Sequence, residues 1–464
     1  MISSNLEKNG FKFPSTPTLL VCVILFAAFL TYVIPAGEFE RVVDEATKRT
    51  LVVAETYRIT ESKPVGFMFL MSAVYRGIVS AASLIAFVFV CGGAFGIINK
   101  TGAIAAGLNN LIGRFRGREN VLIFVIMAAF AIGGMSYGMA EEAIPFIAIL
   151  VPVAIKMGFD PIVGVSMVMV AIYSGYAPGP LNPFNTGVAQ GIAQLPTFSG
   201  LGLRVALAIC ALLVAFQHVV AYGKRYRASG KREDFERWRG DGSEERAMTG
   251  RDGVVLLMLM VSLLVLVYGV LSYGWYLTEM SAIFTICGFV VGLYYFKGSL
   301  ESTVSAFVDG AKDLAGTAII VSLSRGILVV MQEGMIMDTV VYWISLPLSS
   351  LHPVFAAWGM YLSQGFVNFF IPSSSGQAVA VMPIMSALAD LVGVTRQTAV
   401  LAFQCGDGFW NMITPTHATL MASIGIAGIS FDRWVRFAFV LVLKWSVLVF
   451  VALAFAVLTG YGPF

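Results

Sequence analysis

The chain has 464 residues, of which 58% are hydrophobic and only 12% are charged. A soluble domain carries roughly twice that charged fraction, so the composition excludes an ordinary soluble protein and predicts a polytopic membrane protein. The net charge of +3 gives no sign of a nucleic-acid partner. The three histidines and five cysteines show no metal-type spacing and no disulfide framework, which argues against a metal site and against an enzyme.

The first half begins with an apolar run at residues 18–34, about the length that spans a bilayer. Lysines before this run place the N-terminus on the cytoplasmic side. Residues 36–64 then alternate polar and apolar side chains, which predicts a small β-hairpin outside the membrane. An amphipathic stretch at about 66–79 leads into a segment that returns to the cytoplasmic side.

An interrupted apolar segment follows at about residues 120–157, with the tip sequence IGGMSYGMAEEAIPF (132–146). Basic residues at both of its ends predict a re-entrant hairpin that enters and leaves on the cytoplasmic side. A helix over 160–195 is then broken by Gly, Pro, Asn and Thr in YSGYAPGPLNPFNTG (173–187). Non-helical backbone at membrane depth is tolerated only where protein or a water-filled cavity surrounds it.

The second half, 253–464, repeats the construction of residues 1–222 after a basic stretch at 223–252, which we expect to be a cytoplasmic linker. Residues 352–389 form the second predicted hairpin, and residues 397–424 form the second broken helix. The interrupted sequences are NFFIPSSSGQAVAVMPI (368–384) and QCGDGFWNMITPTH (404–417).

The two hairpin sequences align at one constant offset, which pairs Ser136 with Ser374 and Gly138 with Gly376. The charge pattern gives the two halves opposite orientations and puts the C-terminus outside. The sequence therefore predicts an all-α polytopic membrane protein of two inverted repeats, each with a re-entrant helical hairpin and a broken transmembrane helix. Paired interruptions of this kind indicate the binding site of a transporter.

The four interrupted motifs have the composition of a binding site. Helix ends inside the membrane expose backbone N–H or C=O groups, which attract carboxylates or cations respectively. Glycine allows close backbone approach, and Ser, Asn and Thr supply neutral donors and acceptors. The alternative interpretation is that these small residues only pack helices together. The predicted substrate-binding residues are Ser136, Gly138, Asn182, Asn185, Thr186, Ser374, Ser375, Gly376, Asn411, Thr414 and Thr416.

Ionisable side chains inside a membrane are costly and indicate function. The acids would coordinate a coupling cation or an ammonium group, or else pair with basic residues of the spans in a structural role. The four motifs contain three acids and no Lys or Arg, which favours an amino-acid substrate over a doubly negative dicarboxylate. The residues expected to couple ions or compensate charge are Glu141, Glu142, Asp407, Arg325 and His417.

Four segments, GMAEEAIPF, GPLNPFNTG, IPSSSGQA and ITPTHATLM, resemble the DcuC/YfcC group of bacterial carriers, within the ion-transporter superfamily of elevator-type carriers. The resemblance extends over essentially the whole chain. Members are described as four-carbon dicarboxylate carriers or as basic amino-acid exchangers. The resemblance implies a homodimer in the bacterial cytoplasmic (inner) membrane, with a rigid scaffold domain and a moving transport domain that holds the hairpins.

Together these features predict a secondary active transporter rather than an enzyme or a channel. We expect the substrate to be an amino acid, basic or zwitterionic, carried by exchange. The alternative is a four-carbon dicarboxylate carried with Na⁺ or H⁺. No cofactor is expected beyond a coupling Na⁺ or H⁺, and the expected partners are the small-molecule substrate, the lipid bilayer and a second copy of the chain.

Overall fold

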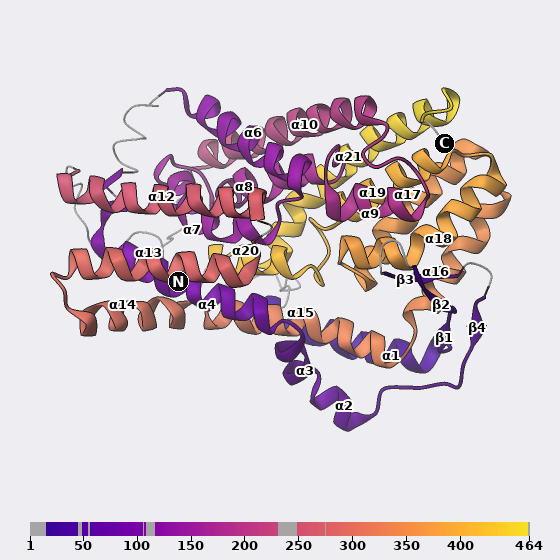
Figure 1. Ribbon diagram of the computed structural model, residues 1–464, viewed down its shortest axis with the longest axis horizontal. Helices are drawn as coiled ribbons and strands as arrows, with labels where there is room; N and C mark the ends of the chain where they lie inside the picture. Colours follow the sequence, from indigo (N-terminus) through magenta and orange to yellow (C-terminus); the bar gives the residue numbers. More distant parts are fainter. Residues whose placement is uncertain are drawn as a thin grey trace, which may run out of the picture.

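The protein is built almost entirely of helices, as a computed structural model shows (Figure 1). Among the described residues, eight helices are long and apolar enough to cross a membrane, which makes the chain a multi-pass membrane protein. The structure describes residues 15–44, 49–53, 56–104, 106–107, 117–230, 248–273 and 275–462. The predicted linker therefore lies largely outside the described residues.

The first half contains the one predicted β element. Strand β2 pairs antiparallel with β3, and β1 pairs antiparallel with β4, so the β-hairpin predicted within residues 36–64 is confirmed. The elements of this half are α1 (Thr16–Val33), β1 (Gly37–Glu38), β2 (Arg41–Asp44), β3 (Arg49–Val52), β4 (Arg58–Ile59), α2 (Phe67–Met71), α3 (Ala73–Ser80), α4 (Ala82–Thr101), α6 (Glu119–Tyr137), η1 (Glu141–Ala143), α7 (Ile144–Lys156), α8 (Pro161–Tyr176), η2 (Pro183–Gly187), α9 (Val188–Ile192) and α10 (Leu201–Ala228).

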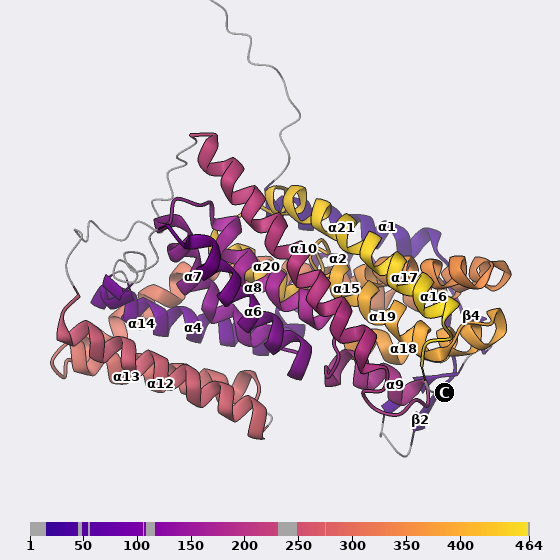
Figure 2. The same ribbon diagram turned by 90° about the horizontal axis from the view of Figure 1, so that it is seen from above.

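The second half is helical in all its described elements. They are α12 (Gly250–Tyr273), α13 (Leu277–Tyr295), α14 (Leu300–Asp313), α15 (Ala315–Glu333), α16 (Met337–Ser345), η3 (Leu346–Ser350), α17 (Pro353–Phe370), α18 (Ser374–Val392), α19 (Arg396–Trp410), α20 (Ala418–Ala427) and α21 (Phe431–Leu458). In both ribbon views α12, α13 and α14 lie at one end of the long axis, and α16, α17 and α18 lie at the other (Figures 1 and 2).

One group of helices comprises α1 to α4 and α12 to α15, and it is held by two similar crossings. A Cβ on Gly77 would lie 2.1 Å from the Ser322 carbonyl oxygen, so α3 crosses α15 in direct backbone contact. A Cβ on Gly310 would lie 2.3 Å from the Gly92 carbonyl oxygen, so α14 crosses α4 in the same way. Helix α1 packs on α15, as α13 packs on α4. Small residues permit such close crossings between membrane helices.

The other group comprises α6 to α10 and α17 to α21, and its packing also occurs twice. Helices α6, α7 and α10 surround α8, and α17, α18 and α21 surround α19. The halves interlock, because α7 contacts α20 and α9 contacts α18. The two groups meet where α15 packs on α20, with Thr317 against Gly425.

The turns of the two helical hairpins correct one predicted correspondence. Tip 1 (residues 138–143) follows Tyr137 and tip 2 (residues 371–373) follows Phe370, so the turns are offset by fewer residues than the aligned serines. Ser136 lies in the last turn of α6 before tip 1, whereas Ser374 is the first residue of α18 after tip 2. The predicted pairing of Ser136 with Ser374 is therefore wrong as a structural equivalence, because Ser136 precedes the turn of its hairpin and Ser374 follows the turn of the other.

Candidate functional site

The first broken helix is shaped by local capping. Helix α8 starts at Pro161, and the Asp160 carboxylate caps it by accepting a hydrogen bond from the Ile162 N–H at 2.6 Å. After α8 ends, the Asn182 side-chain oxygen accepts from the N–H groups of Phe184 (3.0 Å) and Asn185 (3.2 Å) and begins the short π-helix η2. An Asn N-cap satisfies donors that the break would otherwise strand.

Asp407, on α19, has no exposed surface and lies at the centre of a polar group that we call the Asp407 cluster. Asn185 Nδ2 donates to Asp407 Oδ2 at 2.8 Å, and Asn411 Nδ2 donates to Oδ1 at 3.5 Å. Asn368 Nδ2 donates to the Asp407 carbonyl oxygen at 3.2 Å and to Asn411 Oδ1 at 3.0 Å. Within the described part of the chain, no Lys or Arg forms an ion pair with this carboxylate.

Ser374, the first residue of α18 after tip 2, joins this cluster. The Ser374 hydroxyl is buried and accepts a hydrogen bond from the Tyr176 hydroxyl at 2.8 Å. Of the two residues that follow it, Ser375 is half-buried and Gly376 is exposed. Thr416 donates to the Phe369 carbonyl oxygen at 2.8 Å, which ties the second break to the helix before tip 2.

Thr414 and Thr186 complete the two breaks. The Thr414 hydroxyl donates to the Trp410 carbonyl oxygen at 2.8 Å and so closes the end of α19. The Thr186 hydroxyl lies 2.7 Å from the Gly179 carbonyl oxygen and 3.2 Å from Gln404 Oε1, so it connects the first break to α19. Both threonines satisfy interrupted backbone rather than leaving a free hydroxyl.

Tip 1 packs against the first break at a residue that must be glycine. Gly138 ends α6 with φ of +75°, and a Cβ there would lie 2.6 Å from Asn182 Oδ1. The Leu181 N–H donates to the Met135 carbonyl oxygen at 3.0 Å and fixes the same contact. The Ser136 hydroxyl instead donates to the Ile132 carbonyl oxygen of its own helix at 2.6 Å. The Ser136 contacts therefore fit the alternative interpretation, in which small residues of the motifs only pack helices together.

The acids of tip 1 form a second polar group beside the Asp407 cluster. Glu142 is 6% exposed and accepts from the Ala140 N–H at 2.8 Å. Glu141 Oε1 accepts from the Thr419 hydroxyl at 3.2 Å, which links tip 1 to α20. His417 Nε2 lies 2.9 Å from the Tyr173 hydroxyl oxygen, and its Nδ1 has no hydrogen-bond partner among the described residues.

Arg325 approaches this group from α15, in the other group of helices. It lies close enough to His417 and Tyr276 to interact with both electrostatically, and its Nε has no hydrogen-bond partner among the described residues. Lys444, by contrast, is exposed and contacts His218, so it is not part of the buried groups. Of Arg325 and Lys444, only Arg325 therefore lies beside a buried polar group.

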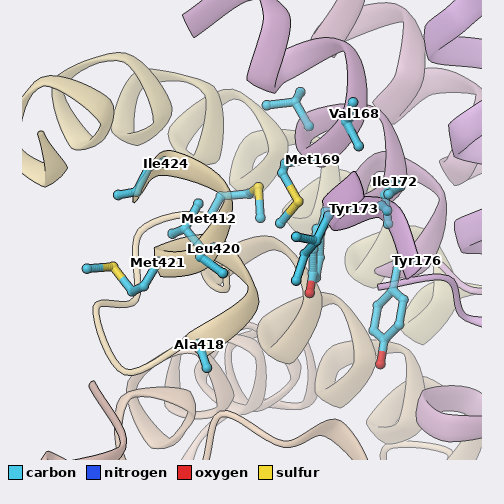
Figure 3. Packing of buried hydrophobic residues seen from close by; sticks show 14 of the residues in the cluster. Val168, Met169, Ile172, Tyr173, Tyr176, Met412, Ala418, Leu420, Met421 and Ile424 are labelled. Atoms are coloured by element: carbon cyan, nitrogen blue, oxygen red, sulfur yellow. The ribbon is translucent and has the colours of Figure 1, made fainter. Parts of the chain in front are cut away.

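Two tyrosines of α8 connect the polar group at tip 1 to the Asp407 cluster. The sequence analysis did not select either of them. Tyr173 and Tyr176 lie one turn apart on α8, with ring centroids 5.2 Å apart, and Tyr173 is the one that lies toward α20 (Figure 3). The Tyr173 hydroxyl contacts His417, and the Tyr176 hydroxyl contacts Ser374. Both stand in the quoted motif YSGYAPGPLNPFNTG, and their spacing of three residues on a helix was the available signal.

The sequence analysis also did not select a buried arginine. Arg204, on α10, has no exposed surface, and its Nε donates to Gln404 Oε1 at 3.0 Å while Nη2 donates to Gln397 Oε1 at 3.0 Å. Gln404 in turn donates to the Pro178 carbonyl oxygen, and its own carbonyl oxygen accepts from Asn185 at 3.3 Å. Arg204 therefore supports both breaks without contacting Asp407.

The structure brings the four interrupted motifs together. Gly138 contacts Asn182, Asn185 contacts Asp407, and the Tyr176 hydroxyl connects α8 to Ser374. A multi-pass helical protein with a buried polar site at two helix breaks and two hairpin tips has the organisation of a membrane transporter.

The comparisons with known proteins give the family. Residues 13–458 match the model of the DcuC family, the C4-dicarboxylate anaerobic carriers, and the chain belongs to that family. It is 32% identical over 477 residues to a protein of Escherichia coli (strain K12) named "Putative basic amino acid antiporter YfcC", covering 94% of each chain. An uncharacterized protein of Haemophilus influenzae is 28% identical over 487 residues, covering 94% of this chain and 95% of the relative.

Solved structures of two transporters match at low similarity. The Alcanivorax borkumensis YdaH transporter matches with a TM-score of 0.43 and 17% identity, over 97% of this chain and 100% of that chain. Neisseria gonorrhoeae MtrF matches with a TM-score of 0.41 and 15% identity, over 95% and 96%. Scores this low carry no argument about site or mechanism.

Proposed function

We propose that this protein is a secondary active transporter that moves an amino acid across the bacterial inner membrane. The supporting observation is Asp407, a carboxylate with no exposed surface, surrounded by amides from both broken helices and α17. A buried carboxylate with no ion-pair partner among the described residues is costly, and inside a membrane it indicates function. A positively charged group that arrives with the solute would neutralise it.

The substrate we propose is a basic or zwitterionic amino acid, carried by exchange. Its ammonium group would bind at Asp407, and Glu141 and Glu142 add negative charge at tip 1. Arg325, which comes from α15 and lies near His417, would face a substrate carboxylate. The name of the Escherichia coli relative is consistent with this substrate class.

The second candidate is a four-carbon dicarboxylate carried with Na⁺, which the family description favours. Asp407 would then hold the cation rather than an ammonium group. Asn185 Oδ1 and Asn368 Oδ1 are buried acceptors without partners among the described residues, and the amide nitrogens of the same side chains donate to Asp407, one to the carboxylate and one to the backbone carbonyl oxygen. Oxygen donors of this kind fit a hard cation such as Na⁺. H⁺ coupling would instead use Glu141, Glu142 and His417.

The mechanism we propose is elevator-type alternating access in a homodimer. The moving unit would be α6 to α10 with α17 to α21, and the scaffold would be α1 to α4 with α12 to α15. Two inverted repeats would account for the reciprocal crossings of α3 with α15 and of α14 with α4. They would also account for a shared spacing along the sequence. The first half is interrupted at Ala81, between α3 and α4, and the second half at Leu314, between α14 and α15. These two interruptions are as many residues apart as the starts of tip 1 and tip 2.

Ligand-induced stabilisation of the purified protein tests this proposal. A ligand that binds only the folded state raises the melting temperature by mass action. We expect arginine, ornithine or lysine to raise it without Na⁺, and to drive counterflow in liposomes. A shift produced only by succinate or fumarate, and only with Na⁺, would refute the amino-acid substrate and establish the second candidate.

A further inference from the structure

A cavity of about 330 Å³ lies between the β-hairpin and the start of α18. Sites for small molecules begin at about 300 Å³. The cavity is lined by β1, β2, the end of α15, the start of α16 and the first turns of α18, and its charged lining residues are Glu38, Arg41 and Asp338. None of these residues belongs to the Asp407 cluster.

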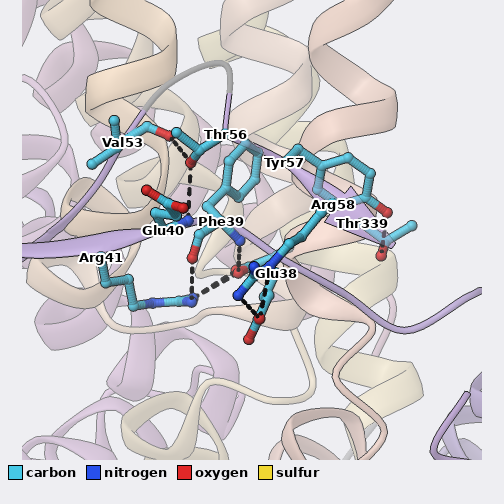
Figure 4. A network of polar contacts seen from close by, with 10 residues as sticks. Glu38, Phe39, Glu40, Arg41, Val53, Thr56, Tyr57, Arg58 and Thr339 are labelled. Atoms are coloured by element: carbon cyan, nitrogen blue, oxygen red, sulfur yellow. Dashed lines mark hydrogen bonds and ion pairs between the residues drawn. The ribbon is translucent and has the colours of Figure 1, made fainter. Parts of the chain in front are cut away.

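Each acid that lines the cavity is paired with an arginine: Asp338 with Arg41, which also lines the cavity, and Glu38 with Arg58, which does not. Arg41 Nη2 donates to Asp338 Oδ2 at 2.7 Å, and Arg58 Nη2 donates to Glu38 Oε1 at 2.7 Å (Figure 4). Among the described residues, Glu38 Oε2 and Arg41 Nε make no hydrogen bond. Glu38 and Arg41, which both line the cavity, therefore each keep a polar atom of opposite charge without a hydrogen bond among the described residues.

Tip 2 separates this cavity from the Asp407 cluster. The buried Ser374 hydroxyl contacts Tyr176, whereas Gly376, two residues later, is exposed and lines the cavity. One turn of α18 thus separates the cavity from the contact between Ser374 and Tyr176.

The cavity also includes an unusual backbone conformation. Met335 has φ of +52°, and its carbonyl oxygen accepts from the Gly37 N–H at 3.1 Å. Non-glycine residues rarely adopt this conformation, which is found at ligand sites where the surroundings enforce it. The contact fixes the β-hairpin to the end of α15 beside the charged residues.

We propose that this cavity is an access site, which holds the ammonium and carboxylate groups of an amino acid before the solute passes tip 2. Glu38 would accept from the ammonium group, and Arg41 would donate to the carboxylate. A carboxylate and a guanidinium at one cavity fit a zwitterion, whereas succinate lacks the ammonium group and agmatine lacks the carboxylate. The inference rests on the proposed function only for the identity of the ligand.

Protection of an introduced cysteine from labelling tests the access site directly. Val379 lines the cavity, so Val379→Cys is labelled with a water-soluble maleimide after the exposed Cys22 and Cys210 are replaced by alanine. We expect L-arginine and L-alanine to slow labelling at least threefold, and succinate and agmatine to leave the rate unchanged. Leu391→Cys, exposed at the far end of α18, is the control whose labelling no ligand should slow.

Three further variants separate the access site from the Asp407 cluster. Protection should persist with Asp407→Asn and should be lost with Arg41→Gln and with Glu38→Gln, while the melting temperature shows that each variant is folded. Loss of protection with Asp407→Asn, equal protection by succinate, or no protection at all would overturn the access site. Protection by amino acids that liposomes then fail to transport would leave the access site standing and refute the proposed function.

Discussion

The two hairpin tips share a backbone plan but differ in chemistry. Tip 1 ends α6 with a left-handed glycine and carries Glu141 and Glu142, while its nearby Ser136 is bonded to its own helix. Tip 2 carries no charge, and Ser374 bonds instead to Tyr176 of the other half. The buried carboxylate beside tip 2 comes from α19. Each half therefore supplies acid at a different position, and the tyrosines of α8 join the two places.

The largest effect should follow from removing the Asp407 charge. We expect Asp407→Asn to lower uptake about 100-fold, because a lost hydrogen bond or ion pair to a charged group costs about 2–3 kcal/mol and 1.4 kcal/mol is tenfold. The measurement is initial uptake by proteoliposomes. Asp390→Asn is the matched control, since Asp390 is an exposed residue of α18 paired with Arg396. Equal uptake by both variants would contradict a site at Asp407.

A substitution at Gly138 tests whether tip 1 shapes the first break. Gly138→Ala should cost about 1–2 kcal/mol from the left-handed backbone alone. Its Cβ would also displace Asn182, so we expect uptake to fall about tenfold beyond the loss of stability. Gly393→Ala has the same kind of backbone, φ of +72°, with nothing within 4 Å of the added Cβ. It should lose stability but keep uptake, and a similar loss of uptake in both would mean that tip 1 acts only through stability.

Removing one tip 1 acid should change how transport responds to ions. Glu142→Gln is expected to lower uptake about tenfold and to alter its dependence on pH or Na⁺, because Glu142 is buried beside Glu141. Uptake measured over a range of pH, with and without Na⁺, checks this expectation. A profile parallel to that of the wild type would make Glu142 a structural residue, with its hydrogen bond to the Ala140 N–H as its role.

The sequence was informative where local chemistry decides the structure. Gly, Pro, Asn and Ser mark where helices are interrupted, so the hairpin ranges and the breaks could be read from them. The β-hairpin followed from alternation over residues 36–64. The constant offset between the hairpin sequences predicted the wrong equivalent residues, because it aligned identical residue types. The positions of the turns depend instead on Gly138 as a left-handed cap and on Ser373 as an N-cap.

Contacts between the halves could not be derived in the same way. Asn185 and Asp407 are 222 residues apart, and Tyr173 and His417 are 244 apart. No local rule pairs such residues, since packing of the whole chain brings them together. Arg204 could not be identified from the sequence for another reason. It lies near the start of an uninterrupted apolar helix, and its role is visible only from its hydrogen bonds to buried amide side chains.

The smallest effect concerns Ser136 and Ser374, the serines that the sequence alignment of the two hairpins had paired. Ser374→Ala should raise the apparent KM about fivefold, since it loses one buried hydrogen bond worth about 1 kcal/mol, with Tyr176 left unsatisfied. Ser136→Ala should change it less than twofold, because among the described residues that hydroxyl bonds only to carbonyl oxygens of its own helix. Uptake kinetics of the two variants, measured side by side, distinguish a tip that contacts the cluster from one that does not. Equal effects would restore the symmetric site that the aligned sequences first predicted.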